Sequence, residues 1–253
     1  MRADSEGPSG PFPTSSPAAD SSLRPGADHV IAVAHRAGND RAALERALSV
    51  GVDAVEADLR WDGGRIVTRH ARRLPFLPVY WDRWYLRLDR RPQLTLDELL
   101  ERIRGRARPY LDLKATHQSF LSALLETLRR HEAVDDADIS SSCWGQLAEL
   151  RRSEPRLRLL RTVGDERQRA AYLALPSDDP LGAGIAIRRN LLDEELASDA
   201  RVRGVPVYVW EVADLEAARQ VVAWGATGVV ADSLELLRAL RSGTELQLGP
   251  GQS

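Results

Sequence analysis

The chain has 253 residues, enough for one large domain or two small ones, and about 250 residues is also the usual size of a single (β/α)8 barrel. Its residues are 43% hydrophobic and 28% charged, a balance that is ordinary for a soluble globular protein and that excludes a fibrous chain. The formal net charge of -2 gives no field that would attract a polyanion, so we expect no nucleic acid partner.

Cysteine usage and the two ends of the chain bear on its compartment. The single cysteine, Cys143, cannot form a disulfide within the chain, and no apolar run approaches the roughly 18 residues that a membrane span requires. We therefore expect a cytoplasmic protein with no transmembrane segment. Residues 1–27 are rich in Ser, Pro, Gly and Asp, which predicts a disordered tail, and they lack the continuous apolar core of a secretory signal. Residues 243–253 are expected to form a flexible C-terminal tail.

Between these tails, short runs rich in Val, Ile and Leu alternate with longer segments of helical period, a pattern typical of parallel strands covered by helices. Eight such runs predict strands at residues 30–34, 54–59, 110–113, 137–141, 157–161, 183–187, 206–210 and 228–231. Eight β/α units in a chain of this length predict an α/β fold, a single-domain (β/α)8 TIM barrel over residues 28–242, in preference to an open sheet.

Two helix boundaries carry clear local signals. The sequence from Thr95 to Glu98 is typical of a capping box, with Leu94 and Leu99 placed to form a hydrophobic staple across the helix start. Further on, Asp214 is placed to cap a helix over residues 215–224, which Gly225 would end in a left-handed conformation.

The connection after the second strand is unusually aromatic. Asp62-Gly63-Gly64 predicts a turn, and residues 66–70 predict a short return strand. Residues 74–88 then bring together five aromatic side chains: Phe76, Tyr80, Trp81, Trp84 and Tyr85. Two interpretations stay open, a loop that folds its own side chains over one end of the barrel, or an apolar wall beside the site that contacts a lipid or another bulky substituent.

Polar residues recur at the carboxyl ends of the predicted strands, where (β/α)8 barrels place their active sites. Glu56 and Asp58 are two residues apart on one strand and so share a face, and the same holds for Asp112 and Lys114 on the next. Three carboxylates at one barrel mouth repel one another unless a cation neutralises them. Oxygen ligands favour a hard divalent cation, so the sequence predicts a site for Mg²⁺ or Ca²⁺.

Histidines and cations accompany these carboxylates in the sequence. The ordinary pKa of histidine suits proton transfer near neutral pH, so His35 and His70 are predicted to act as an acid and base pair. Arg36 and Lys114, the chain's one lysine, would supply positive charge for an anionic substrate, and the combination indicates phosphoryl chemistry. A Glu-x-Asp at a strand end is more often a solvated strand terminus or half of an ion pair than a metal site. The order of these carboxylates, histidines and basic residues, and their placement at strand ends, nevertheless favour a functional site.

At these residues the chain resembles the glycerophosphodiester phosphodiesterase family, from about His29 to Leu240. The first strand of that family ends in His-Arg-Gly, and its second carries Glu-x-Asp, followed by Asp-Gly and then by histidine. The matching segments here are Ala34-His35-Arg36-Ala37-Gly38, Glu56-Ala57-Asp58, Asp62-Gly63, Arg69-His70 and Leu111-Asp112-Leu113-Lys114, together with residues 94–100, 204–210 and 224–232.

The resemblance implies a metal-dependent hydrolase that cleaves glycerophosphodiesters, or lysophospholipids, to an alcohol and glycerol phosphate, with a place in lipid metabolism. Its substrate would be a small-molecule or lipid-derived phosphodiester. By this resemblance the metal ligands are Glu56, Asp58 and Asp112. The proton-transfer residues are His35 and His70, and the phosphate-binding residues are Arg36 and Lys114. The sequence does not predict an oligomeric state.

Several positions depart from the family pattern. Ala71 replaces the aspartate after the second histidine, Asp112 replaces a glutamate, and Glu211 stands where threonine is common. We expect Trp210, at the end of its strand, to contact the substrate. Through Asp112 and Trp210 the chain also resembles the related sphingomyelinase D type phospholipases. Two alternatives therefore stay open: a lyase of that type that releases a cyclic phosphate, and a catalytically idle barrel that binds a phosphorylated ligand.

Overall fold

The structure is a computed structural model that describes residues 29–73, 79–82, 85–88 and 93–242. Both predicted tails, residues 1–27 and 243–253, lie outside the described residues. So do the aromatic side chains predicted to gather at residues 74–88. The barrel strands and every predicted site residue lie within the described residues.

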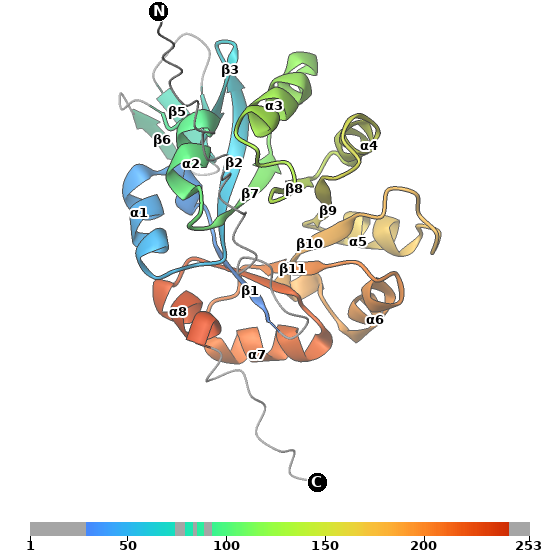
Figure 1. Cartoon of the computed structure of the whole chain (residues 1–253). Helices are drawn as coiled ribbons and strands as arrows, with labels where there is room; N and C mark the ends of the chain where they lie inside the picture. Colours follow the sequence, from blue (N-terminus) through green and yellow to red (C-terminus); the bar gives the residue numbers. More distant parts are fainter. Residues whose placement is uncertain (1–28, 74–78, 83–84, 89–92, 243–253) are drawn as a thin grey trace, which may run out of the picture.

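A closed barrel of parallel strands forms the centre of the molecule (Figure 1). Around the barrel the strand order is β1-β12-β11-β10-β9-β8-β7-β2, and pairing of β1 with β2 closes the ring. The barrel strands are β1 (Ile31–Ala34), β2 (Ala54–Asp62), β7 (Arg108–Leu113), β8 (Asp138–Ser141), β9 (Arg158–Val163), β10 (Gly184–Arg188), β11 (Val207–Trp210) and β12 (Gly228–Ala231). Each predicted strand is present to within a few residues, and the predicted (β/α)8 TIM barrel is confirmed.

Helices surround the barrel, one after each parallel strand and its connection (Figure 1). They are α1 (Arg41–Ser49), α2 (Leu96–Ile103), α3 (Gln118–Arg130), α4 (Trp144–Ser153), α5 (Glu166–Leu173), α6 (Glu194–Val202), α7 (Leu215–Trp224) and α8 (Leu234–Ser242), with short 3-10 turns at Ala37–Asn39 and Arg189–Leu191. Among the described residues, no helix combines the length and the apolar character that crossing a bilayer would need.

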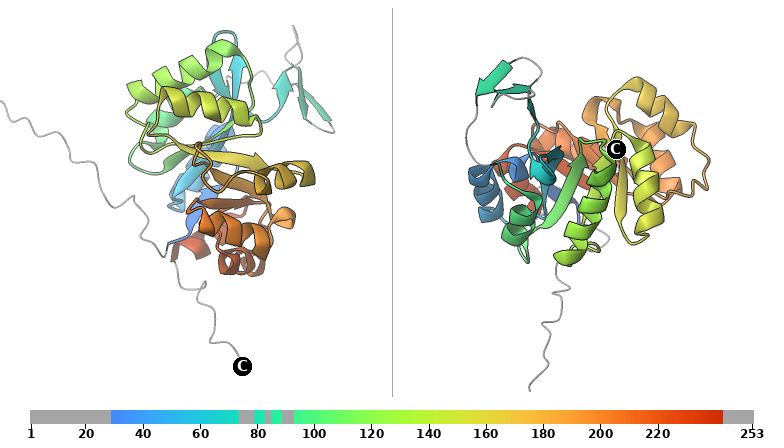
Figure 2. Two further views of the ribbon diagram at one scale, coloured as in Figure 1. Left: turned by 90° about the vertical axis from the view of Figure 1, so that its right-hand side faces the viewer. Right: turned by 90° about the horizontal axis from the view of Figure 1, so that it is seen from above.

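The connection between β2 and α2 contains the predicted return strand. β3 (Arg65–Thr68) runs antiparallel to the outer part of β2 after the Gly63-Gly64 turn. Beyond it, β4 (Arg72–Arg73), β5 (Val79–Asp82) and β6 (Tyr85–Leu88) form a separate small sheet, which projects from the barrel in both views of Figure 2.

Alternation along the strands divides the core into two parts. Every second residue of each strand, called here the residues of inner parity, points into the barrel. Val33, Ala54, Tyr110, Tyr208 and Val230 belong to the one buried cluster that these side chains form. Their neighbours of the other parity join the larger cluster between barrel and helices. The two tyrosine rings pack edge to face with centroids 5.5 Å apart. Because residues of the inner parity fill the barrel, the next ones along each strand must emerge at its mouth.

The amino-terminal end of the barrel is closed by a buried polar network centred on Asp138. Its carboxylate accepts hydrogen bonds from Arg108 Nη2 at 2.8 Å, Arg158 Nε at 2.7 Å and the Tyr208 hydroxyl at 3.0 Å. The Asp138 side chain is only 3% exposed, so this charge is stable there only because the arginines compensate it. The network is structural and lies at the opposite end from the predicted site.

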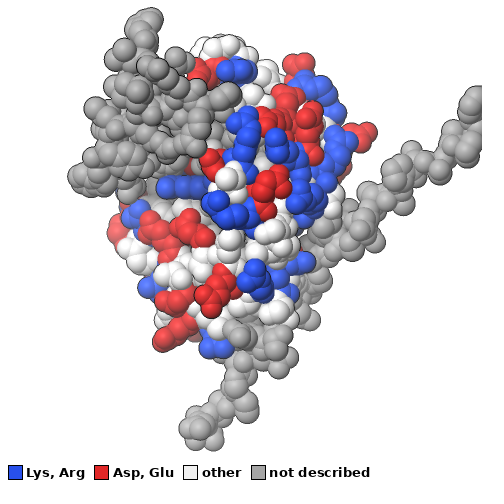
Figure 3. Space-filling model, turned by 90° about the vertical axis from the view of Figure 1, so that its left-hand side faces the viewer, with Lys and Arg blue, Asp and Glu red and all other residues white. Residues whose placement is uncertain are grey.

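The helix caps follow the predictions closely. Thr95 Oγ1 accepts a hydrogen bond from the Glu98 peptide N–H at 3.2 Å, and Asp214 caps α7, which ends at Gly225 in the left-handed conformation. The Glu98 carboxylate differs from the expected capping box, because it pairs with Arg41 at 2.5 Å instead of reaching back to the helix start. Figure 3 shows that basic and acidic side chains intermix on the face it presents, as such pairs require.

Candidate active site

A pocket of about 660 Å³ opens at the carboxyl ends of the barrel strands. Many of its residues lie two or four positions beyond the last inward-pointing side chain of their strand, as Glu56 and Asp58 do on β2 and Asp112 and Lys114 do on β7. The lining comprises His35, Arg36, Glu56, Asp58, His70, Tyr110, Asp112, Lys114, Ser142, Thr162, Gly164, Asp165, Gln168, Ala186, Arg188, Trp210, Glu211, Val230 and Asp232. Every site residue predicted from the sequence is therefore in this one pocket, while their individual roles stay predictions.

Three carboxylates cluster on the part of the pocket wall formed by β2 and β7. Glu56 and Asp58 are 4% and 2% exposed on β2, and Asp112 lies beside Asp58 on β7, where the two residues are paired in register. One oxygen from each of the three lies within 4.8 Å of the others. Oxygens that share one Mg²⁺ or Ca²⁺ at about 2.0–2.6 Å can be at most about 4–5 Å apart, so the three fit the first shell of a single hard cation.

Crowding of negative charge perturbs these groups. Burial, followed by the charges of Asp58 and Asp112, raises the pKa of Glu56 well above its usual range. Burial also raises the pKa of Asp112, against the attraction of Lys114. For Asp58 burial acts in the same direction, but the attraction of Lys114, followed by that of His70, holds its pKa below its usual range. Without a cation the cluster thus favours a proton on Glu56, and a divalent ion would replace that proton.

Lys114 provides the cluster's own positive charge. Its ammonium lies 3.3 Å from Asp58 Oδ1 and also forms an ion pair with Asp112. Burial lowers the pKa of Lys114, but the two carboxylates outweigh burial and raise it above the usual value. Lys114 is therefore charged and 28% exposed, so it can reach both the carboxylates and a ligand in the pocket.

The turn after β1 orients two of the carboxylates. Arg36 has a φ of 51°, which directs its peptide N–H to Glu56 Oε2 at 2.6 Å. Asn39 contacts Asp58 twice: its amide Nδ2 donates to Asp58 Oδ2 at 2.7 Å, and its Oδ1 accepts from the Asp58 peptide N–H at 2.9 Å. A Cβ at Gly38 would lie 2.7 Å from that of Ala57, so only glycine lets this turn pack so closely on β2. The Arg36 guanidinium is left 45% exposed at the mouth, with Nε 3.9 Å from Asp58.

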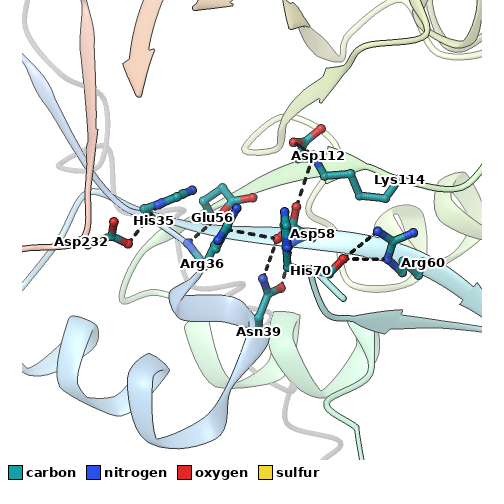
Figure 4. Close-up of polar contacts among 10 residues, drawn as sticks. All are labelled: His35, Arg36, Asn39, Glu56, Asp58, Arg60, His70, Asp112, Lys114 and Asp232. Carbon is teal, nitrogen blue, oxygen red and sulfur yellow. Dashed lines mark hydrogen bonds and ion pairs between the residues drawn. The ribbon is translucent and has the colours of Figure 1, made fainter. Parts of the chain in front are cut away.

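Two histidines flank the carboxylates (Figure 4). His35 follows β1, and its Nδ1 lies 2.9 Å from Asp232 Oδ1, an interaction that lowers the pKa of Asp232. This contact occupies Nδ1 and leaves Nε2 as the ring nitrogen for proton transfer. His70 follows β3, where Arg60 fixes its carbonyl oxygen with two hydrogen bonds of 2.6 and 3.1 Å. In Figure 4 the His35–Asp232 pair lies at one end of the group and Arg60 at the other.

Several residues of the site were not among the predicted ones, and they include Asp232 and Arg188, which line the pocket, and Asn39, which hydrogen-bonds Asp58. Asp232 and Arg188 could have been found, because they continue the inner parity of β12 and β10 just as Asp112 does on β7. Asn39 could not be found in this way, because it lies in a 3-10 turn and not on a strand. Its place in the site is visible only from its hydrogen bond to Asp58.

Comparison with known proteins was made by sequence and by structure. No family model matches the chain, and no curated protein matches it either. Solved structures do match. A protein assigned as a glycerophosphoryl diester phosphodiesterase from Silicibacter pomeroyi DSS-3 has a TM-score of 0.71 at 20% identity, with 87% of this chain and 96% of that chain covered.

Two further structures agree. A glycerophosphodiester phosphodiesterase from Parabacteroides distasonis has a TM-score of 0.68 at 19% identity, with 86% of this chain and 99% of that chain covered. A phosphodiesterase from Oleispira antarctica in complex with its product sn-glycerol-3-phosphate has a TM-score of 0.67 at 20% identity, with 85% and 96% covered. The fold expected from the motifs is confirmed: the chain has the fold of the glycerophosphodiester phosphodiesterases.

Proposed function

We propose that the protein is a divalent-cation-dependent phosphodiesterase that hydrolyses glycerophosphodiesters to an alcohol and glycerol phosphate. The observation that carries the proposal is the triad Glu56, Asp58 and Asp112, whose oxygens lie within 4.8 Å of one another in a pocket that two histidines also line. Neighbours with the same fold are named as phosphodiesterases of this class, and one binds sn-glycerol-3-phosphate. Three clustered carboxylates repel one another, and the single ammonium of Lys114 offsets only part of that repulsion.

The residues of the pocket divide the chemistry among them. Glu56, Asp58 and Asp112 would hold Mg²⁺ or Ca²⁺, which when bound supplies charge compensation for a phosphodiester. Lys114 and Arg36 extend positive charge to the open part of the pocket, where they would bind the non-bridging phosphate oxygens. In this proposal the phosphate would lie between the carboxylates and the solvent.

Proton transfer falls to the two histidines. One takes the proton from the attacking hydroxyl, either water or a hydroxyl of the substrate, as the new P–O bond forms. The other donates a proton to the leaving alcohol oxygen as the old P–O bond breaks. Asp232 holds His35 in one tautomer through Nδ1, so this ring acts through Nε2 in either role.

Turnover measurements on the full chain test the proposal. The substrates are glycerophosphodiesters and lysophospholipids, each assayed with Mg²⁺, with Ca²⁺ and with EDTA. We expect activity that requires a cation and falls by about 10²–10⁴-fold in His35→Ala and in His70→Ala. His29→Gln is the matched control, because His29 precedes β1 at the other end of the barrel and contacts Asp53.

Each alternative gives a distinct result. Unchanged turnover in either pocket variant would remove the acid and base assignment. A cyclic phosphate that accumulates as the end product, detected by ³¹P NMR, would favour the lyase. Tight calorimetric binding of cation and glycerol phosphate without turnover of any substrate would favour an idle barrel.

A further inference from the structure

The pocket extends beyond the carboxylate triad to the opposite wall of the barrel. In the ring of eight strands β10 lies four places from β2, directly across the mouth from Glu56 and Asp58. The last residue of β10 is Arg188, which is paired in register with Trp210, the last residue of β11. A phosphodiester bound at the triad would therefore direct one of its two substituents toward Arg188 and Trp210.

The Arg188 guanidinium lies over the ring of Trp210. Its guanidinium carbon is 4.8 Å from the centroid of the Trp210 ring, and its Nε is 3.2 Å from Glu211 Oε2. Gly164 also packs closely on the Trp210 ring, since a Cβ added at Gly164 would be 3.6 Å from that ring. The Arg188 side chain is 27% exposed, so its position is set by these contacts while its outer edge still faces the pocket.

Glu211 is directed toward Arg188 by an unusual backbone conformation. Its φ is 63°, in the left-handed region, which is unfavourable for residues other than glycine. It follows directly on β11 and brings a carboxylate to a pocket wall that would otherwise carry an unbalanced arginine. Arg188 and Glu211 together therefore form a neutral pair that offers both donors and acceptors.

This arrangement bears on the charge of the alcohol that the wall can accept. A quaternary or primary ammonium group binds best on an aromatic face with a carboxylate beside it. Here Arg188 already covers the Trp210 face and neutralises Glu211. Within the described part of the chain the terminal amino groups of Arg188 donate no hydrogen bond, so they can donate to hydroxyl oxygens.

We infer that Arg188, Trp210 and Glu211 form the subsite for the alcohol substituent of the diester and select an uncharged polyol over a cationic amino alcohol. The inference rests on the proposed function for the position of the phosphate. Arg188 and Glu211 hydrogen-bond the hydroxyl groups of the polyol, while their pairing leaves neither a free carboxylate nor an open aromatic face for an ammonium group.

The test compares kcat/KM for two polyol diesters, glycerophosphoinositol and glycerophosphoglycerol, with that for glycerophosphocholine and glycerophosphoethanolamine. We expect the polyol diesters to be favoured by about tenfold or more, the size of effect that one desolvated cationic contact produces. Arg188→Gln uncovers Trp210 and frees Glu211, so the preference should fall by about tenfold. Glu211→Gln leaves Arg188 on the ring and should keep choline disfavoured.

Arg189→Gln is the matched control, because Arg189 is the adjacent arginine but contacts Gln220 on the exposed surface. Its preference should equal that of the wild type. Equal or better use of the choline diester by the wild-type protein would overturn the inference, and so would an unchanged preference in an Arg188→Gln protein that unfolds at the wild-type temperature.

Binding separates this inference from the proposed function. Calorimetric titration of His70→Ala with glycerophosphoinositol and glycerophosphocholine measures the same preference without turnover. A dissociation constant tenfold lower for the polyol diester would support the subsite. Failure of the wild type to hydrolyse any of the four diesters would contradict the proposed function but not the subsite. Equal dissociation constants would overturn the subsite whether or not the enzyme is active.

Discussion

Replacing Glu56 by glutamine should make the cation-free protein more stable at pH 7.5 and abolish its response to divalent cations. The pKa of Glu56 is raised by burial and then by the neighbouring carboxylates Asp58 and Asp112. A carboxyl group whose pKa is higher in the folded than in the unfolded chain binds more protons when folded. The stability of the cation-free protein must therefore fall as pH rises from the ordinary value of 4.5 toward the folded value.

Two estimates bound the size of this penalty. The cost of keeping Glu56 protonated is at most about 1.4 kcal/mol for each pH unit above the ordinary value of 4.5, so its upper limit at pH 7.5 is about 4 kcal/mol. Ionising it instead brings charges together within 4.8 Å, and one such pair repels by about 3.5 kcal/mol at an effective dielectric constant of about 20. Attraction by Lys114 offsets part of either cost. We expect Glu56→Gln to gain about 2 kcal/mol, which is about 4–8 °C in a domain of this size.

Thermal unfolding followed by circular dichroism measures this effect. In EDTA, Glu56→Gln should unfold at a higher temperature than wild type at pH 7.5, and the difference should shrink at pH 5. Saturating Mg²⁺ or Ca²⁺ should raise the wild-type midpoint, by about 2.7 kcal/mol of stability at a hundred times the dissociation constant, and leave the variant nearly unchanged. Glu149→Gln, on the exposed face of α4, is the control and should behave as wild type.

The reasoning would be refuted in two ways. A lower midpoint for Glu56→Gln in EDTA at pH 7.5 would mean that the Glu56 carboxylate stabilises the fold without a cation. An undiminished rise of the variant's midpoint with cation would mean that the ion binds elsewhere.

Two further predictions concern groups at opposite ends of the barrel. Asp232→Asn should lower kcat by about a hundredfold and alter the ¹⁵N shifts of His35, because the tautomer fixed through Nδ1 is lost; unchanged kcat would show that the 2.9 Å contact has no part in catalysis. Tyr208→Phe should cost about 1 kcal/mol in urea unfolding, since it removes one of three hydrogen bonds to Asp138. Asp138→Ala should cost about 3–5 kcal/mol, because the charge of Arg108 then stays buried without a carboxylate partner; equal losses in both variants would contradict this account.

The fold could be predicted from the sequence because parallel barrel strands are buried on both faces and so appear as continuous apolar runs. The strand at residues 228–231, for example, is Gly-Val-Val-Ala, and all four residues are buried. Helix α7 has the bounds that Asp214 and Gly225 predicted, since both caps act through local backbone geometry. Glu98 could not be placed in this way, because its partner Arg41 is 57 residues away.

The site was predictable where it depends on parity within one strand and unpredictable where it depends on distances between turns. Glu56 and Asp58 share a face by alternation alone, so their proximity follows from the sequence. Asn39 reaches Asp58 only because the 3-10 turn before α1 packs against β2 through Gly38. No local pattern encodes that approach, and the sequence therefore gave no reason to single out Asn39.

Backbone strain adds an independent indication of where function lies. Three non-glycine residues in the described part of the chain have positive φ: Arg36, Glu132 and Glu211. Glu132 follows the end of α3, the usual place for a left-handed residue, whereas Arg36 and Glu211 both line the pocket. Glycine would relieve each of these strains, which cost about 1–3 kcal/mol. The proposed roles would account for this cost: Arg36 would bind a phosphate beside the triad, and Glu211 would act on the alcohol through Arg188.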